Sequence, residues 1–502
     1  MKRRTFVRST LAAAAAMSVP GRRSLATIYQ DAPQDPPDVS SITGAGREVT
    51  LSGKAIAELK GQLRGRLLLA SDEGYDRARQ VLNPGIDKHP ALIVQVTGTA
   101  DVRTAVDFAR DNDNLLLAVK CGGHSFSGKS TCDGGMMIDL SPFRDVRVDP
   151  NARRAWVTGG SLLGQLDHES MAHDLVAPMG TVSHTGVGGL VTGGGFGRVA
   201  RRFGMSIDNL VAVDVVTADG QFRHANKDEN PDLFWGVRGG GGNFGVVTSF
   251  EFQLHPMQRQ VVGGRIMWPI AQAREVMSMY AEYLPQAPDE LDLIFFMAEP
   301  PAGQEGVVGL AVCYSGPESQ AERALAPIRK LGTPMVDSIG AVDYVALQRS
   351  GDYDDVRTHA TYLKGGFIPD LPPELVSAVV DGWQGDARRS TTVFIQPSGG
   401  VIARVANDAT AFAHRDALGN LGASVDWAVG EDPTEHIGWL KGYWTGIERF
   451  TQGFYANDLE FDVTAAKINA NYRGNYDRLV QIKNEYDPEN LFRLNPNVEP
   501  SV

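Results

Sequence analysis

The sequence is poor in cysteine, has no excess of basic residues and offers only a short apolar run near its start. Each of these lacks excludes a class of protein. Three cysteines among 502 residues are too few for a disulfide framework. The formal net charge of −12 argues against nucleic acid or an anionic membrane as a partner. The apolar run LAAAAAMSVP (11–20) is too short to span a bilayer. We therefore expect neither a nucleic-acid partner nor a membrane span.

Signatures of nicotinamide and metal sites are incomplete. The run GVGGLV (186–191) begins like the GxGxxG turn of a nicotinamide-binding fold, but it ends in valine. Cys121, His124 and Cys132 have no second pair of metal ligands nearby in the sequence. A Walker-type loop is not expected either. A Cys121–Cys132 disulfide stays open at this point, and it would leave Cys313 unpaired.

The first 26 residues are typical of an export signal. MKRRTFVRST supplies a basic start with paired arginines, an apolar run follows, and Ser24-Leu25-Ala26 suits a small-residue cleavage site. The twin arginine resembles a Tat signal, so we expect export to the periplasm or the medium. Removal of residues 1–26 leaves 42 basic and 60 acidic residues, a formal charge of −18. Residues 27–48, polar and Pro-rich at their start, are predicted to be a flexible lead-in.

The pattern of predicted strands and helices changes near residue 258, which predicts two structural units. Before it, apolar runs at 91–98 and 114–120 flank a stretch with helical periodicity at 101–112, which predicts a strand–helix–strand unit. Strand-like and helical segments also alternate after it. The strands are predicted at 292–298, 307–316, 391–405 and 423–430. The pattern predicts a second α+β domain with an antiparallel sheet backed by helices. From about residue 466 the tail has helical spacing.

Three glycine-rich segments carry the functional signal. They are KCGGHSFSG (120–128), GTVSHTGVGGLVTGGGFG (180–197) and RGGGGNFGVVTSFEF (238–252). Glycine-lined turns expose backbone N–H groups, which bind phosphate well. Three such segments in one chain favour a cofactor that contains phosphate. His124 sits in the first segment directly after a predicted strand, an unusual place for a histidine that only satisfies a polar contact.

These segments identify a family. VKCGGHSFSG followed by MMIDLS resembles the flavin-attachment loop of the berberine-bridge-enzyme-like oxidases. These oxidases belong to the vanillyl-alcohol-oxidase / p-cresol-methylhydroxylase type of FAD proteins. The second and third glycine segments and the tail NYRGNYDRLVQIKNEYDPENLFRLNPNV extend the resemblance over roughly residues 75 to 500. The resemblance implies an FAD domain over 49–257, a substrate domain over 258–454 and a C-terminal return to the FAD domain over 455–502.

The resemblance also assigns residues. It implies that FAD is bonded covalently through its 8α-methyl group to His124. The positions assigned to cofactor contact, including the glycine loops, are Lys120, Cys121, Gly122, Gly123, His124, Ser125, Gly128, Thr181, Val182, His184, Thr185, Gly188, Gly189, Gly193, Gly194, Gly197, Gly245, Val246, Val247, Asn457, Tyr472 and Asn475.

The sequence departs from the family pattern at two places. Many members have a second flavin link from the cysteine of a Cys-Pro-Thr-Val-Gly-Val-Gly-Gly run, and Val182 stands at that position here. We therefore expect one link, without a cysteinyl bond. Members typically show Tyr-x-Asn followed by an aromatic residue that serves as a base, but here Tyr455-Ala456-Asn457 is followed by Asp458. Asp458 is a candidate base because burial raises a carboxyl pKa toward neutrality, although it could simply cap a turn. Tyr455 and Tyr362 are the other candidates.

The resemblance implies an FAD-linked oxidoreductase, with dioxygen as the expected acceptor. Oxidised flavin takes a hydride from a substrate C–H bond while a base removes a proton. A small molecule is the expected substrate, whether an alcohol, a sugar or an aromatic or alkaloid-like metabolite. A dehydrogenase with another acceptor and a flavin-binding protein without turnover are the alternatives. No oligomeric state is predicted.

Overall fold

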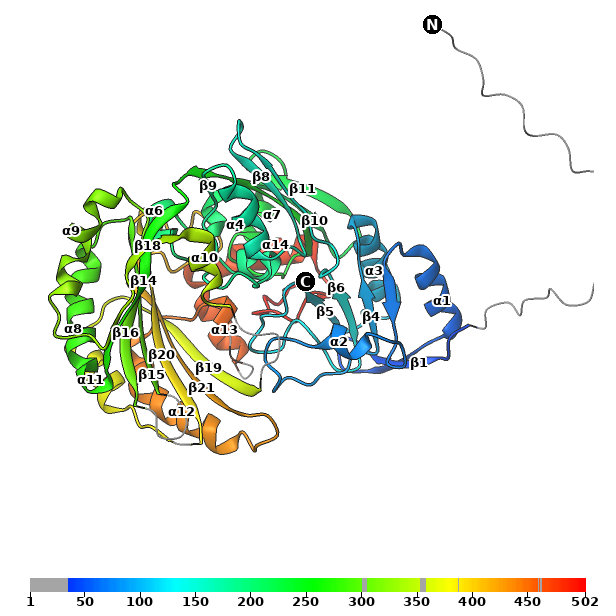
Figure 1. Cartoon of the computed structure of the whole chain (residues 1–502). Helices are drawn as coiled ribbons and strands as arrows, with labels where there is room; N and C mark the ends of the chain where they lie inside the picture. Colours follow the sequence, from blue (N-terminus) through cyan, green and yellow to red (C-terminus); the bar gives the residue numbers. More distant parts are fainter. Residues whose placement is uncertain (1–34, 300–304, 353–357, 387, 459, 461–462) are drawn as a thin grey trace, which may run out of the picture.

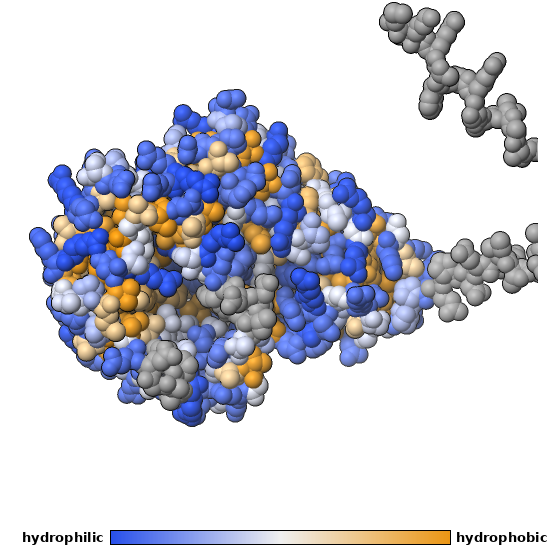
Figure 2. All heavy atoms as spheres, viewed as in Figure 1, coloured by the Kyte–Doolittle hydropathy of each residue, from blue (hydrophilic) through white to orange (hydrophobic). Residues whose placement is uncertain are grey.

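The computed structural model describes residues 35–299, 305–352, 358–386, 388–458, 460 and 463–502. These form two domains with separate hydrophobic cores (Figure 1). The predicted export signal lies outside the described residues. No helix in the described ranges has the length and apolar character needed to cross a bilayer. Hydrophilic residues cover most of the face shown in Figure 2.

The first domain contains two sheets with a helix between them. The smaller sheet has the strand order β3-β4-β6-β5, with the last three strands parallel, and the larger has the antiparallel order β11-β10-β12-β8-β7. Helix α3 (Thr99–Asp111) buries Val102, Ala105, Val106 and Ala109 against strands of both sheets. The strands are β3 (Arg66–Leu68), β4 (Leu92–Gln95), β5 (Leu117–Lys120), β6 (Met136–Asp139), β7 (Val146–Asp149), β8 (Arg154–Thr158), β10 (Leu210–Val216), β11 (Phe222–Asn226) and β12 (Val246–Gln253).

Shorter elements complete this domain. Helix α14 packs on α7 and brings the C-terminal tail back to the first domain. The predicted helical tail is interrupted at Arg473, which has a positive φ of 48°. The remaining elements are α1 (Gly53–Gln62), α2 (Tyr75–Arg79), α4 (Leu163–Met171), β9 (Leu175–Val176), α5 (Val187–Thr192), α6 (Ala200–Phe203), α7 (Pro231–Val237), β13 (His255–Pro256), α13 (Ala465–Asn471) and α14 (Tyr476–Tyr486).

The second domain is an antiparallel sheet backed by helices, as predicted. Its strand order is β17-β14-β16-β15-β20-β21-β19, and β18 also pairs with β14. Helices cover its outer face at the left of Figure 1. The elements are β14 (Gln260–Pro269), α8 (Ala273–Tyr283), β15 (Leu291–Glu299), β16 (Val307–Tyr314), α9 (Glu318–Arg329), β17 (Val336–Asp337), β18 (Gly340–Asp343), α10 (Tyr344–Arg349), β19 (His359–Ile368), α11 (Pro373–Asp381), β20 (Ser390–Pro397), β21 (Gly419–Ala428) and α12 (Thr434–Ile447).

Two predicted segments need correction. The lead-in is not flexible over its last part, because β1 (Val39–Ile42) pairs with β2 (Glu48–Leu51) and Ser41 donates a hydrogen bond to the Gly134 carbonyl. The strand predicted over 391–405 ends at Pro397, since Gly399 and Gly400 follow with positive φ of 81° and 56°. Residues beyond this break, such as Ile402 and Phe412, pack in the core of the first domain.

A buried ion pair fixes the start of the C-terminal segment. Lys483 Nζ lies 2.6 Å from Asp487 Oδ2 and donates to the carbonyls of Asn243 and Phe492, with both charged side chains fully buried. The Asp487 carboxylate also accepts hydrogen bonds from the backbone N–H groups of Leu491 and Phe492. The pair therefore ties the last helix to the segment that follows it.

Replacing Lys483 by Met should lower the free energy of unfolding by about 3–5 kcal/mol, because the Asp487 carboxylate would stay buried without its partner. Thermal or denaturant unfolding measures the change. Lys54→Ala, which removes an exposed pair with Glu58, is the control and should cost less than about 1 kcal/mol. Equal and small losses in both variants would contradict a structural role for the buried pair.

Candidate active site

A cavity of about 330 Å³ lies between the two domains. Its wall combines the loop after β5, the segment 180–193, the turn before β12, residues 455–458 and the C-terminal stretch 492–496. Gln396 of β20 is the contribution of the second domain's sheet. All three glycine-rich segments found in the sequence thus meet at one cavity, whose size is that of a small-molecule site.

The first two glycine segments touch each other through their backbones. A Cβ on Gly122 would lie 2.4 Å from the nitrogen of Gly186, and a Cβ on Gly186 would lie 2.4 Å from Cys121 Sγ. Glycine is therefore required at these two positions by contact within the protein. Gly189 differs, since it lines the cavity and a Cβ there would meet no protein atom within 4 Å. Its missing side chain leaves room on the cavity side.

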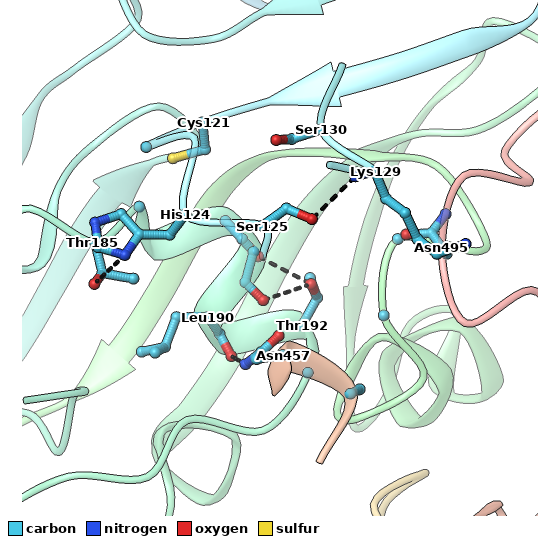
Figure 3. A pocket seen from close by; sticks show the side chains of 18 of the residues that line it. Cys121, His124, Ser125, Lys129, Ser130, Thr185, Leu190, Thr192, Asn457 and Asn495 are labelled. Carbon is cyan, nitrogen blue, oxygen red and sulfur yellow. Dashed lines mark hydrogen bonds between the residues drawn. The ribbon is translucent and has the colours of Figure 1, made fainter. Parts of the chain in front are cut away.

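His124 lies on the cavity wall and contacts a second histidine. Its Nε2 is 2.6 Å from His184 Nδ1, and its Nδ1 is 3.4 Å from Thr185 Oγ1 (Figure 3 shows the contact with Thr185). His124 follows β5 by four residues, and His184 comes from the second glycine segment. The approach of Gly122 to Gly186 is what brings the two rings together. One nitrogen of His124 is thus engaged by a group that can accept or donate a proton.

All three cysteines are free and buried, so the Cys121–Cys132 disulfide left open by the sequence is wrong. Cys121 Sγ lies 3.6 Å from the Ser161 carbonyl, while Cys132 Sγ lies 3.5 Å from the Met136 carbonyl. Burial raises the pKa of Cys121 to about 11 and that of Cys132 to about 12. Both thiols therefore stay protonated at neutral pH. Within the described part of the chain, no three His, Cys, Asp or Glu side chains are grouped to hold a metal ion.

Tyr455 and Asn457 also line the cavity and hold the second glycine segment by direct hydrogen bonds. The Tyr455 hydroxyl accepts hydrogen bonds from Gly195 N at 3.0 Å and from Asn457 Nδ2 at 2.8 Å. Asn457 Nδ2 also donates to the Leu190 carbonyl. Burial, followed by the nearby Asp458 carboxylate, raises the Tyr455 pKa well above its usual value. The phenol is therefore a poor base and a good hydrogen-bonding anchor.

Asp458 is the carboxylate on the cavity wall. Its Oδ2 accepts a hydrogen bond of 2.7 Å from Asn420 Nδ2, and that amide also donates to Gln396 Oε1 at 3.1 Å. Burial raises the pKa of Asp458 to about 6, and the hydrogen bond from Asn420 opposes the rise. At neutral pH the group is mostly ionised, yet its pKa is close enough to neutrality for proton transfer.

The third candidate base lies off the cavity wall. Tyr362 is buried in β19, and its hydroxyl is 3.1 Å from Glu460 Oε2. Lys364 Nζ also approaches Glu460 Oε2, at 2.5 Å. Tyr362 therefore belongs to a polar cluster with Glu460 and Lys364, and none of the three lines the cavity.

Several residues assigned to the cofactor from the sequence stand behind the wall. Asn475 Nδ2 donates to the carbonyls of Asn407 and Thr410, and the Tyr472 side chain is buried in the first domain's core. Lys120 donates to the Ala78 carbonyl and lies 3.8 Å from Asp139, its register partner in the parallel sheet. The assigned residues that do not line the cavity are Lys120, Gly128, His184, Gly194, Gly197, Tyr472 and Asn475.

Sequence reasoning missed part of the wall. Although no Walker-type loop is expected, the run GHSFSGKS (123–130) matches the Gly-x4-Gly-Lys-Ser pattern of such a loop. No helix follows the run, so the exclusion still holds. Lys129 and Ser130 nevertheless line the cavity, and Lys129 N donates to Ser125 Oγ (Figure 3). The C-terminal residues Phe492 and Asn495 were also missed, although they lie in the tail that carries the resemblance.

The wall fits a flavin nucleotide in its chemistry. Apolar side chains such as Leu117, Val119 and Val246 suit an aromatic ring system, while glycine backbone and Lys129 suit phosphate. Gly189 leaves space that a side chain would otherwise fill. Fold and cavity together therefore agree with the FAD-binding type of protein that the sequence predicts.

Known proteins share both features. Residues 90–226 match the family described as FAD binding domain, and residues 455–499 match the family described as berberine and berberine like. An FAD-linked oxidoreductase of Dictyostelium discoideum is 31% identical over 434 residues, covering 86% of this chain and 93% of the relative. (R)-6-hydroxynicotine oxidase of Paenarthrobacter nicotinovorans is 30% identical over 452 residues, covering 87% and 97%. The chain therefore belongs to the berberine-bridge-enzyme-like family of FAD-linked oxidoreductases.

Solved structures agree. The crystal structure of 6-hydroxy-D-nicotine oxidase from Arthrobacter nicotinovorans superposes with a TM-score of 0.80 at 29% identity, covering 88% of this chain and 98% of that one. A structure of glucooligosaccharide oxidase from Acremonium strictum, described with a 6-S-cysteinyl, 8α-N1-histidyl FAD, gives 0.79 at 26% identity, covering 89% and 99%. The protein is an FAD-linked oxidoreductase with this fold.

Gly189→Ala should lower the flavin-to-protein ratio at least about tenfold, because its methyl group enters the cavity, while the melting temperature of cofactor-free protein stays within a few degrees of wild type. Gly122→Ala should lower both quantities, since its methyl group meets the backbone of Gly186. Absorbance spectra and thermal unfolding measure the two effects. Full flavin content in Gly189→Ala would show that the cofactor does not come close to this position.

Proposed function

We propose that the protein is an exported oxidase whose FAD is bonded through the 8α-methyl group to His124 alone. Its substrate is a small molecule with an oxidisable C–H bond, such as an alcohol, a sugar or an aromatic or alkaloid-like metabolite, and dioxygen is the acceptor. The observation that carries the proposal is the position of His124 on the cavity wall, with one ring nitrogen 2.6 Å from His184. The relatives named as oxidases support the choice of acceptor.

The contact between His124 Nε2 and His184 leaves Nδ1 as the nitrogen of His124 to which FAD would be attached. With a proton on Nε2 donated to His184 Nδ1, the Nδ1 of His124 carries a lone pair. A bond from Nδ1 to the 8α-carbon would release one proton from each partner and two electrons, which dioxygen would take up to give hydrogen peroxide. His184 would accept the Nε2 proton as positive charge develops on the His124 ring.

We expect only one covalent bond between FAD and the protein, because no side chain at the cavity is suited to form a second. Val182 lines the cavity where many relatives of the family have the second attachment cysteine. Cys121 also lines the cavity, but burial raises its pKa to about 11, and a protonated thiol is a weak nucleophile. Neither side chain therefore competes with His124.

Substrate oxidation needs a base on the cavity wall, and Asp458 is the best candidate. FAD, when bound, supplies the hydride acceptor. Asp458 would take the hydroxyl or amine proton of the substrate, and Asn420 would hold its carboxylate through the hydrogen bond to Oδ2. Tyr455 would keep the 190–195 segment in place through its hydroxyl. The tether at His124 would retain the cofactor in a compartment where FAD is not replenished.

His124→Ala should bind FAD but release all of its colour on acid precipitation, whereas the wild-type pellet should stay yellow. The visible spectrum of pellet and supernatant measures this directly. The variant still has the glycine-lined wall, so noncovalent flavin remains the internal control for folding. A colourless wild-type pellet would refute the covalent bond.

Asp458→Asn should lower the rate of flavin reduction about 10²–10⁴-fold, the usual loss when a general base is removed. In the wild type, a carboxyl pKa of about 6 means that the rate should be highest above pH 6 and decline as the base becomes protonated below it. Stopped-flow bleaching of the flavin under anaerobic conditions, with a panel of alcohols, sugars and amines, measures both. A pH profile unchanged by the substitution would assign the base to another group, and a flavin bleached by no compound would favour a binding protein.

Export through the Tat route is the remaining part of the proposal. The twin arginine Arg3-Arg4 and the short apolar run that follows support it. Replacing both arginines by lysine should leave the protein in the cytoplasm with its signal uncut, as measured by cell fractionation. Unchanged export of this variant would rule out the Tat route.

A further inference from the structure

A segment of the second domain runs along the cavity segment of the first. Gln348 Nε2, from α10, donates to the Gly180 carbonyl at 2.8 Å. Gly351 lies so close to the Thr181 carbonyl that a Cβ on it would be 2.8 Å from that oxygen. Asp352 then accepts two hydrogen bonds from Ser183, one from the backbone N at 2.8 Å and one from the hydroxyl at 2.6 Å.

The segment that receives these contacts carries His184, which contacts His124. Ser183 stands between Val182, which lines the cavity, and His184, which contacts His124. On the side of the first domain, the N-terminus of α4 holds the same residues, since Gly164 N donates to the Ser183 carbonyl and Leu163 N donates to the Thr185 carbonyl. The remaining hydrogen-bonding groups of Ser183 are its N–H and its hydroxyl. Both are bound by the Asp352 carboxylate.

The second domain is anchored at this place. Tyr344, Val345 and Leu347 of α10 are buried in a cluster with Met171, Val176 and Val199 of the first domain. Asp352 itself is exposed, so neither burial nor packing explains its position. Its two carboxylate oxygens accept hydrogen bonds from one residue of the other domain, Ser183. Such a bidentate arrangement holds the backbone of that residue in one conformation.

We propose that Asp352 is a positioning residue for flavin attachment, which holds His184 against His124 and makes the bond to FAD depend on docking of the second domain. This inference rests on the proposed histidyl bond. In a chain whose second domain is not docked, the 182–185 segment lacks one of its two supports and His184 loses its fixed place. FAD would then bind without becoming attached.

Asp352 affects the formation of the bond between His124 and FAD. The His124 nitrogen bonds to the 8α-carbon, two protons leave, and two electrons pass to dioxygen. Asp352 touches neither the histidine ring nor the cofactor. It acts through Ser183, whose backbone sets the direction of the His184 side chain. Its removal should therefore slow attachment and leave noncovalent FAD binding intact.

The test compares the acid-stable fraction of total flavin in Asp352→Ala, Asp352→Asn and wild type, each purified as the full chain. Asp352→Ala should show attachment about tenfold slower than wild type, the change expected when hydrogen bonds to a charged group are lost. Time courses of added FAD with the flavin-free protein measure the rate. Asp352→Asn keeps an acceptor oxygen and should recover part of it. Asp370→Ala, an exposed carboxylate of the same domain, is the matched control and should behave like wild type.

Two further measurements separate positioning from general damage. Total flavin bound and melting temperature should stay near wild type in Asp352→Ala, because only the ratio of covalent to total flavin should fall. In a His184→Ala background, Asp352→Ala should cause no further slowing, since both changes act through the same ring. Wild-type attachment in Asp352→Ala, or an equal loss in the His184→Ala background, would overturn the proposal. Wild-type protein without acid-stable flavin would instead refute the histidyl bond itself.

Discussion

The close approach of two backbones, at Gly122 and Gly186, is the constraint on which the site depends. A side chain at either position would meet backbone or sulfur atoms at less than 2.5 Å. The contact joins the loop after β5 to the segment before α5, and so brings His124 to 2.6 Å from His184. Some glycines of these two segments are therefore needed for packing of one segment against the other within the protein. Only some of their glycines, such as Gly189, leave space for a cofactor.

The second domain contributes to this site in two different ways. Asn420 and Gln396, from its sheet, form a hydrogen-bonded row that ends at the Asp458 carboxylate. The Gln348–Asp352 region lies instead along the segment that carries His184, the partner of His124. The second domain thus contacts the site both at the proposed base, Asp458, and beside the proposed attachment residue, His124. Under the proposed attachment at His124, docking of the second domain and attachment of the cofactor would be coupled.

The sequence predicts the parts of this structure that depend on local patterns. Apolar runs and helical spacing were enough for the strand–helix–strand unit around α3, and the resemblance gave the expected domain order and the candidate His124. Contacts between distant segments carry no such signal. Three examples are hydrogen-bonded contacts that join residues far apart in the chain. Ser41 donates to the Gly134 carbonyl, the Asn475 amide donates to the Asn407 carbonyl, and Asp352 accepts from Ser183. The position of Tyr362 away from the cavity wall is likewise set by the packing of β19, which local sequence does not show.

The central claim is that one histidine of one glycine loop carries the flavin, and peptide mapping tests it most directly. Trypsin cleaves after Lys120 and Lys129, and releases CGGHSFSGK (121–129) with His124 as its only histidine. All flavin absorbance should elute with this peptide, whose mass should exceed the unmodified value by that of one FAD less two hydrogens. The peptide that contains Val182 should be unmodified. Flavin on any other peptide, or on none, would contradict the account.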